Sequence, residues 1–244
     1  MPLSETGSVK GLVVAAGMGT RLRSIAPSKP LALVCGVPLI ESVIETAALA
    51  GVDRFVVVTG YESASLEVFL GAFARRSGFL IETVHNPDWT RPNGLSVAAA
   101  EAMLDEYFVL MMADHLFEPV ILSDLLAAPR VAGGVTLAVD RRLDNPMVDL
   151  DDVTRVETDS GGRIVRIGKG LEAYDAFDTG VFLASTGLID AIRSDVAEGG
   201  TGSISAGMAR LADAGLACSF DIGDRFWLDV DDPASWEQAE RLRA

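Results

Sequence analysis

The chain contains 244 residues, of which 49% are hydrophobic and 23% are charged, a balance typical of a globular protein. Its 35 Asp and Glu outnumber its 20 Lys and Arg, and the net charge of −15 argues against binding to nucleic acid or to anionic membranes. No stretch reaches the roughly 18 apolar residues that a membrane span needs, and the first ten residues lack the apolar core of a secretory signal. Two distant cysteines, Cys35 and Cys218, fit a reducing compartment, so a soluble cytoplasmic protein is predicted.

Short apolar runs alternate with segments of helical spacing along the first half of the chain. The apolar runs predict strands over 12–16, 55–58, 79–84 and 107–112. Helices are predicted over 38–50, 62–75 and 94–104, with Pro38 and Gly51 suited to the two ends of the first one. Because strands that alternate with helices pair in parallel, the sequence predicts an α/β fold with a mostly parallel central sheet flanked by helices.

The second half of the chain changes character over 140–170, where charges become more frequent and helical spacing disappears. Two runs, 154–157 and 163–167, flank the turn residues 159–162 and predict a β-hairpin, which we interpret as a small inserted β layer. The remaining predicted elements are a strand at 179–183, helices at 188–196 and 203–214, a strand at 225–228 and a final helix from Pro233. No linker or repeat interrupts this pattern, so one domain is predicted over 1–244.

A glycine loop, Ala15-Ala16-Gly17-Met18-Gly19-Thr20-Arg21, follows the first predicted strand. Small residues at such a place let backbone N–H groups approach the phosphates of a ligand. A dinucleotide-binding fingerprint would require a glycine where Leu22 stands, and Pro27 and Pro30 argue against a helix that starts directly from the loop. A dehydrogenase is therefore disfavoured, whereas a simple turn without a ligand remains an alternative for the two glycines alone.

Further motifs accompany this loop along the whole chain. In order they are Gly17-x-Gly19-Thr20-Arg21, Lys29-Pro30-Leu31, Val37-Pro38-Leu39-Ile40, Asn93-Gly94-x-Ser96, Ala113-Asp114-His115, Gly168-Lys169-x-Leu171, Asp178-Thr179-Gly180 and Trp227-x-Asp229-Val230-Asp231. Together they resemble the signature of the nucleotidyltransferases that join a nucleoside triphosphate to a phosphorylated sugar, alcohol or choline. The motifs at Asp114, Gly168 and Asp178 are most similar to those of CTP:inositol-1-phosphate cytidylyltransferases, although Ala113 stands where many relatives have glycine.

The resemblance implies a Rossmann-like nucleotidyltransferase fold and a transfer of CMP from CTP to a small phosphorylated alcohol. Inositol 1-phosphate is the acceptor it favours, with pyrophosphate as the second product. Phosphocholine, a phosphonate such as 2-aminoethylphosphonate and a sugar 1-phosphate remain alternatives. A non-catalytic nucleotide-binding module would be expected to have lost Arg21, Lys29 or the acidic residues, and all are present. The oligomeric state stays open, with a homodimer as one option.

Such a reaction brings two polyanions together, so the site must supply positive charge and positioning. Arg21 and Lys29 are the predicted catalytic cations, which would lie over the triphosphate while Gly17 and Gly19 offer backbone donors. Asp114 follows an apolar strand, where ligands bind in open α/β sheets. Together with Asp229, which follows another apolar run, it is predicted to hold Mg²⁺, a cation that prefers carboxylate and phosphate oxygens.

A general base is not required, because the second pKa of a phosphate monoester is about 6 and the acceptor is already a dianion at neutral pH. His115 is therefore expected to orient Asp114 or the backbone rather than to transfer a proton.

The remaining predicted site residues are assigned by the resemblance and by their polar groups. The nucleotide is expected to contact Ala15, Ala16, Gly17, Gly19, Thr20, Asn93, Gly94, Ser96 and Asp114. Lys169 is expected to bind the phosphate of the acceptor, and the substrate-binding set is completed by Asp149, Asp178 and Thr179. Nothing in these residues by itself selects cytosine over uracil, or one acceptor over another.

Overall fold

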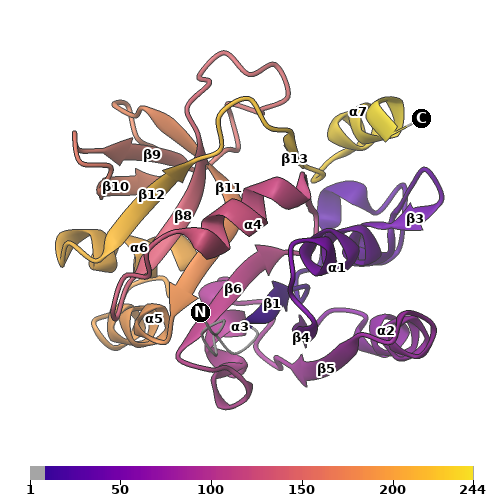
Figure 1. Ribbon diagram of the computed structural model, residues 1–244. Helices are drawn as coiled ribbons and strands as arrows, with labels where there is room; N and C mark the ends of the chain where they lie inside the picture. Colours follow the sequence, from indigo (N-terminus) through magenta and orange to yellow (C-terminus); the bar gives the residue numbers. More distant parts are fainter. Residues whose placement is uncertain (1–8, 244) are drawn as a thin grey trace, which may run out of the picture.

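The computed structural model describes residues 9–243 and places a nine-stranded sheet at the centre of the molecule (Figure 1). Residues 1–8 and residue 244 lie outside the described part. The expectation that the first ten residues are not a secretory signal therefore concerns mostly residues outside it. The strands of this sheet are β1 (Lys10–Val14), β4 (Arg54–Thr59), β5 (Leu80–His85), β6 (Tyr107–Met112), β8 (Val135–Asp140), β9 (Arg155–Thr158), β10 (Ile164–Gly168), β11 (Ala176–Ser185) and β12 (Ala217–Asp221).

The sheet combines a parallel half with an antiparallel one. Strand β1 lies parallel to both β4 and β6, and β5 lies parallel to β4, as the alternation of strands and helices predicts. Strand β11 runs antiparallel to β6, β8 and β9, whereas β12 is parallel to β8. The predicted hairpin is β9–β10, and it extends the edge of the central sheet because β9 also pairs with β11.

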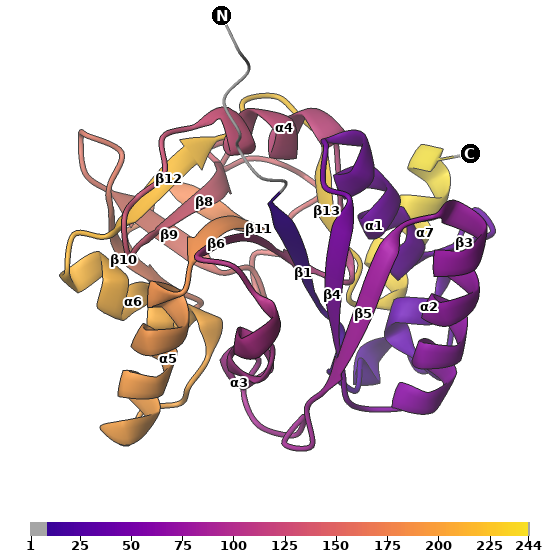
Figure 2. The ribbon, with the colours of Figure 1, turned by 60° about the horizontal axis from the view of Figure 1, so that its bottom comes forward.

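Helices cover both faces of the sheet. They are α1 (Leu39–Leu49), α2 (Ser63–Ser77), α3 (Gly94–Ala99), α4 (Pro119–Ala127), α5 (Gly187–Ala197), α6 (Ile204–Asp213) and α7 (Pro233–Arg243). Figure 2 shows α3, α5 and α6 on one face, with α1, α2 and α4 on the other. The predicted helix over 94–104 is α3 followed by a 3₁₀ turn at Glu101–Met103. Among the described residues, no helix is long and apolar enough to cross a bilayer.

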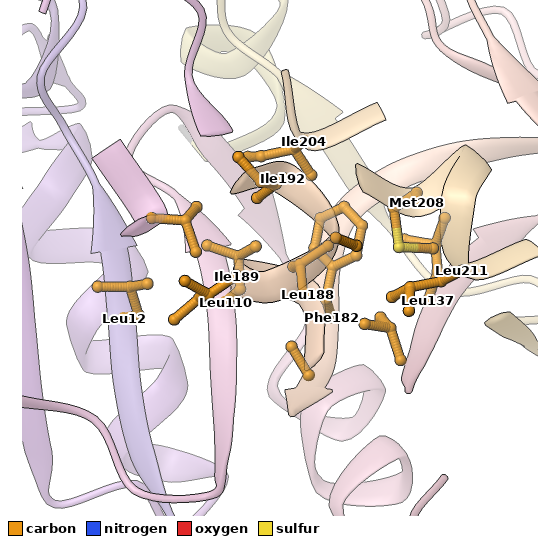
Figure 3. Packing of buried hydrophobic residues seen from close by; sticks show 14 of the residues in the cluster. Leu12, Leu110, Leu137, Phe182, Leu188, Ile189, Ile192, Ile204, Met208 and Leu211 are labelled. Carbon is orange, nitrogen blue, oxygen red and sulfur yellow. The ribbon is translucent and has the colours of Figure 1, made fainter. Parts of the chain in front are cut away.

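The alternation of side chains along β1 divides the core into two layers. Leu12 packs with Leu110, Phe182 and Ile189 on the face covered by α5 and α6 (Figure 3), whereas Val13 belongs to the cluster on the opposite face. Each of these five side chains is buried, and each buried aliphatic or aromatic side chain contributes about 1.5–3 kcal/mol to the stability of the folded state. The strands that lead to the site are therefore firmly held.

Two small ribbons complete the fold on the side of the glycine loop. Strand β7 (His115–Phe117) pairs with β13 (Trp227–Asp229), and β2 (Leu33–Val34) pairs with β3 (Val37–Pro38). A third apolar cluster packs Leu22, just after the glycine loop, with Leu116 of β7 and Leu228 of β13. This packing holds the glycine loop against the ribbon that carries the acidic residues.

Candidate active site

A cavity of about 320 Å³ opens beside the glycine loop and the β7–β13 ribbon. The site residues predicted from the sequence that line it are Arg21, Asn93, Asp114, Asp149, Lys169, Asp178 and Asp229. Strands β1 and β6 are parallel, with Val14 opposite Met112, so the glycine loop and Asp114 leave the sheet at the same edge. This is the edge at which open α/β sheets bind ligands.

The glycine loop is shaped by its contact with Lys29. Gly19 has a φ of 58°, and a Cβ atom there would lie 2.3 Å from Cβ of Lys29, so only glycine fits. Ala15 and Ala16 are buried, and their backbone is fastened to the strand β4 region: N–H of Ala15 donates to the carbonyl of Val58 at 3.0 Å. Gly17 is exposed, and the space beside its Cα atom is open.

Two cations of the loop region are paired with carboxylates. Lys29 is buried and forms ion pairs with Asp114 and Asp231. Burial opposes its charge, but Asp114, Asp229 and Asp231 together raise the pKa of Lys29 above its ordinary value. Arg21 forms an ion pair with Asp231 and donates from Nη2 to Oδ2 of Asp152 at 2.7 Å. Both predicted catalytic cations are therefore charged at neutral pH. Arg21 lines the cavity, whereas Lys29 does not line it but binds two carboxylates that do.

The carboxylates of Asp114 and Asp229 suit a divalent cation. Each has one buried oxygen, Oδ1, without a hydrogen-bond partner among residues 9–243. Ligand atoms of Asp114, His115 and Asp229 lie within 4.8 Å of one another, and a second such group comprises Asp152, Asp229 and Asp231. Burial alone would raise the pKa of Asp229, but His115 and the nearby cations lower it to about 2. Ionised carboxylates with free oxygens are the ligands that a hard divalent cation prefers.

His115 is fixed from both sides of its ring. Nδ1 lies 2.8 Å from the carbonyl oxygen of Thr179 and donates to it, and Nε2 lies 3.4 Å from Oδ2 of Asp229. Burial disfavours the imidazolium, but Asp229 and Asp114 raise the pKa of His115 to about 10. Gly180, at φ 76°, lies under the ring, and a Cβ atom there would be 2.2 Å from Nδ1 of His115. His115 thus binds the backbone, one of the two expected roles, but the carboxylate nearer to its Nε2 atom is that of Asp229 and not that of Asp114.

The Asp178-Thr179-Gly180 motif is largely engaged within the protein. Oδ1 of Asp178 accepts from N–H of Gly180 at 2.7 Å, and burial raises the pKa of Asp178 to about 6. Thr179 is fully buried, and its hydroxyl donates to the carbonyl of Ala138 at 2.8 Å. Asp178 lines the cavity, whereas Thr179 does not and instead holds His115 through its carbonyl oxygen.

The predicted nucleotide-side turn joins α3 to α6. Oδ1 of Asn93 accepts from N–H of Ile204 at 3.1 Å, and a Cβ atom on Gly94 would lie 2.3 Å from the carbonyl oxygen of Gly202. Ser96 is buried and accepts a hydrogen bond from the side chain of Asn86 at 3.0 Å. Asn93 lines the cavity, whereas Gly94 and Ser96 do not, and the side chain of Ser96 is engaged by Asn86. Thr20 begins a 3₁₀ turn, Thr20–Leu22.

The acceptor side of the cavity comes from the segments before β9 and after β10. Nζ of Lys169 lies 2.5 Å from Oδ1 of Asp152. Asp149 is exposed, lines the cavity and accepts from N–H of Asp151 at 3.0 Å. Thus Lys169 and Asp149, predicted for this role, lie at the same cavity as Arg21.

Sequence reasoning missed Asp152 and Asp140. Asp152 stands in an acidic run without a motif, and only the fold shows that it binds both Arg21 and Lys169. Asp140, at the end of β8, is fully buried and accepts a hydrogen bond from Nε1 of Trp227 at 2.8 Å. Trp227 stands two residues before Asp229, so this bond fixes the strand that carries Asp229. The only pattern in the sequence that could have indicated Asp140 is its place as a single aspartate at the end of an apolar run.

Comparisons with known proteins show the family to which the chain belongs. A model of the MobA-like NTP transferase domain matches residues 11–206. The bifunctional IPC transferase and DIPP synthase of Rubrobacter xylanophilus is 35% identical over 249 residues, covering 99% of this chain and 54% of the relative. The CMP-5′-(3-aminopropyl)phosphonate synthase of Streptomyces rubellomurinus is 31% identical, covering 95% of this chain and 38% of the relative. This chain thus spans about half the length, or less, of these curated relatives.

A solved structure supports the same relationship. The inositol-1-phosphate CTP transferase from T. maritima superposes with a TM-score of 0.81 at 26% identity, and 97% of each chain is covered. The region matched by the family model contains the glycine loop, Lys29, Asp114 and Lys169. The chain belongs to the MobA-like NTP transferase domain family and is a nucleotidyltransferase.

Proposed function

We propose that this chain transfers the cytidylyl group of CTP to inositol 1-phosphate and releases pyrophosphate. The observation that carries the proposal is the position of two cations, Arg21 and Lys169. Both bind the carboxylate of Asp152, at 2.7 Å and 2.5 Å. A phosphate bound to Arg21 and a phosphate bound to Lys169 would therefore lie close together near Asp152. The joining of a triphosphate to a phosphate monoester requires this proximity. The name of the T. maritima structure, an inositol-1-phosphate CTP transferase, supports CTP and inositol 1-phosphate as the substrates.

The proposed reaction is an in-line displacement. An oxygen of the acceptor phosphate attacks the α-phosphorus of CTP, and the bond from this phosphorus to the oxygen bridging to the β-phosphate breaks. Pyrophosphate leaves with the electron pair, and no proton has to be removed because the attacking phosphate is a dianion. Arg21 and Lys29 would bind the triphosphate and stabilise the charge that develops on the leaving pyrophosphate, while Lys169 would hold the acceptor phosphate.

The metal is proposed to be Mg²⁺, held by Asp114 and Asp229. Their unpartnered Oδ1 atoms and the lowered pKa of Asp229 fit this role. When bound, the cation would neutralise phosphate charge at the reacting centre. His115 would keep the carboxylate of Asp229 in place, because Thr179 and Gly180 fix its ring from the other side.

Recognition of the two organic groups is proposed to use the remaining predicted residues. The side chain of Asn93, which lines the cavity, would face the cytosine ring or its ribose. Asp149 and Asp178 would accept hydrogen bonds from hydroxyl groups of the inositol ring, since both line the cavity.

An aminoalkylphosphonate is a second candidate acceptor, and one feature of the cavity favours it. The acceptor side of the cavity is lined by the carboxylates of Asp149, Asp152 and Asp178 and by the ammonium group of Lys169, so negative charge predominates there. An ammonium group would pair favourably with such a surface. The phosphonate-related name of the S. rubellomurinus relative points to the same class of acceptor.

A comparison of kinetic constants for different substrate pairs tests the proposed function. The purified chain is incubated with CTP, UTP, dTTP, ATP or GTP and with inositol 1-phosphate, phosphocholine, 2-aminoethylphosphonate or glucose 1-phosphate, and kcat/KM is measured for each pair. We expect the highest kcat/KM for CTP with inositol 1-phosphate. A tenfold preference for phosphocholine or a phosphonate would overturn the acceptor, and a preference for UTP or dTTP with a sugar 1-phosphate would overturn both substrates.

A further inference from the structure

Arg21 and Lys169, which line the cavity, and Lys29, which binds two of its lining carboxylates, are all paired with carboxylates of the protein itself. Lys29 pairs with Asp114 and Asp231, and Arg21 pairs with Asp231. Incoming phosphates would have to use the same cationic groups. Therefore the binding of a polyanion requires an exchange of partners rather than an addition to free charges.

Asp152 is the carboxylate that spans the cavity. Its Oδ2 accepts from Nη2 of Arg21 at 2.7 Å, and its Oδ1 accepts from Nζ of Lys169 at 2.5 Å. Arg21 belongs to the glycine loop, Lys169 follows β10, and Asp152 lies in the turn that precedes β9, so one side chain links three separate segments. Burial would raise the pKa of Asp152, but the hydrogen bonds from Lys169 and Arg21 lower it, and the group is ionised at neutral pH.

We propose that Asp152 is a specificity-determining residue that occupies the place of a phosphate between Arg21 and Lys169. In the free protein its carboxylate holds both cations, and the substrates displace it from both. This inference rests on the proposed function for the roles of the two cations. A ligand with one phosphate would have to replace both ion pairs of Asp152 with few new contacts, so it binds weakly. CTP and a phosphorylated acceptor together supply one phosphate to Arg21 and another to Lys169.

The exposure of these groups makes the exchange feasible. The side chain of Asp152 is 27% exposed, and those of Arg21 and Lys169 are 48% and 59% exposed. Ion pairs at such positions contribute little to stability because water and salt screen them. A phosphate dianion carries more negative charge than a carboxylate and forms charge-assisted hydrogen bonds with the same guanidinium and ammonium groups. The pairs with Asp152 therefore hinder weak anions without preventing the substrates from binding.

The proposal predicts an outcome opposite to that of an ordinary binding residue. Asp152→Asn keeps the size of the side chain but removes the charge, so it frees Lys169 for external anions and leaves Arg21 with Asp231 as its remaining carboxylate. Binding is measured by titration calorimetry in EDTA at fixed ionic strength, with inorganic phosphate and CTP as the probes. We expect the Kd of inorganic phosphate to fall at least fivefold, and the Kd of CTP to fall by a smaller factor.

Two further variants separate this effect from a general change in charge or in folding. Asp151→Asn makes the same charge change at the exposed neighbouring residue, and it is expected to leave both Kd values within twofold of wild type. In Asp152→Asn/Lys169→Met, the gain in phosphate affinity should be lost, because the freed cation is absent. Circular dichroism and the thermal midpoint check the fold, and Asp152→Ser is the second variant should Asp152→Asn unfold.

The outcomes distinguish this inference from the proposed function. Unchanged or weaker phosphate binding in a folded Asp152→Asn variant would overturn the inference, because Asp152 would then organise the cations for the ligand. The inference would also fail if Asp151→Asn produced the same gain. Whether the wild-type chain forms a CDP-alcohol is decided by its product, and the binding of inorganic phosphate tests Asp152 independently of that result.

Discussion

His115 and Asp229 face each other across the β7–β13 ribbon, with Nε2 of His115 3.4 Å from Oδ2 of Asp229. The other ring nitrogen of His115 donates to the carbonyl oxygen of Thr179, so the imidazole is clamped between the carboxylate and the turn at Gly180. This contact explains why three motifs that are distant in sequence occur together. The histidine sets the position of Asp229, and the turn sets the position of the histidine.

The first prediction concerns Asp114 and Asp229. Asp114→Asn or Asp229→Asn should lower kcat by about 10²-fold or more, because each removes a charged oxygen ligand from the metal position. The free energy of unfolding should fall far less than the activity, and it is measured by urea denaturation beside the rate assay. Asp213→Asn, at the end of α6, serves as the control and should retain wild-type turnover. Full activity of the wild-type protein in excess EDTA would refute the assignment of these residues to a metal.

The second prediction compares two glycines with similar backbone angles. Gly199 has a φ of 85° with open space beside it, whereas Gly180 has a φ of 76° and lies against the ring of His115. Gly199→Ala should cost about 1–2 kcal/mol of stability from backbone strain alone. Gly180→Ala should lose more stability and also lower kcat, since the new methyl group displaces His115. Equal effects of the two substitutions on kcat would show that the ring of His115 does not matter to the site.

The third prediction separates chemistry from binding at the loop cations. Lys29→Met and Arg21→Gln should each lower kcat by about 10²-fold, because these cations act most strongly when charge develops on the departing pyrophosphate. The split between kcat and the KM for CTP is obtained from steady-state kinetics. An unchanged kcat with a raised KM would make the residue a ground-state binder instead.

Much of the fold could be predicted because local patterns decide it. The strand at β1, the helix α1 and the hairpin β9–β10 follow from apolar periodicity and turn residues, and the structure has each of them. Strand β8 and helix α4 were not predicted. Both lie between two better-marked regions, and β8 is buried along its whole length, so it lacks the alternation that would identify it.

The site divides in the same way. Arg21, Asp114 and Lys169 could be found from motifs, because the chemistry demands cations and carboxylates at loop and strand ends. Ser96 and Thr179 belong to the same motifs, but their side chains bind Asn86 and the backbone of Ala138 instead of facing the cavity. Long-range contacts decide such orientations, and a sequence pattern does not contain them. Asp152 was missed for this reason, because both of its cationic partners come from other segments.

The fourth prediction uses the buried carboxylate of Asp140. Burial opposes its charge, but hydrogen bonds from Arg142, Trp227 and Asn145 hold the pKa of Asp140 below its ordinary value of 3.8. Its contribution to stability is therefore complete above about pH 4 and is lost as the pH falls through the lower, folded-state pKa. Asp140→Asn should cost about 2–3 kcal/mol at pH 7, because it puts an amide in place of the charged acceptor.

The test of Asp140 is a pair of unfolding curves. Urea denaturation of the wild-type protein and of Asp140→Asn is measured between pH 7 and pH 3. The difference in unfolding free energy should stay constant down to about pH 4 and should shrink below it. A difference that is independent of pH over the whole range would show that folding does not lower the pKa of Asp140.

The central claim, cytidylyl transfer to the acceptor phosphate, is tested most directly by ³¹P nuclear magnetic resonance of one reaction mixture. The wild-type chain is incubated with CTP, inositol 1-phosphate and Mg²⁺, and the phosphorus signals are followed with time. We predict that the signal of inositol 1-phosphate is replaced by two coupled signals of a pyrophosphate diester, with one equivalent of free pyrophosphate. The account would be contradicted if inositol 1-phosphate persisted unchanged, or if pyrophosphate appeared together with CMP and no diester formed.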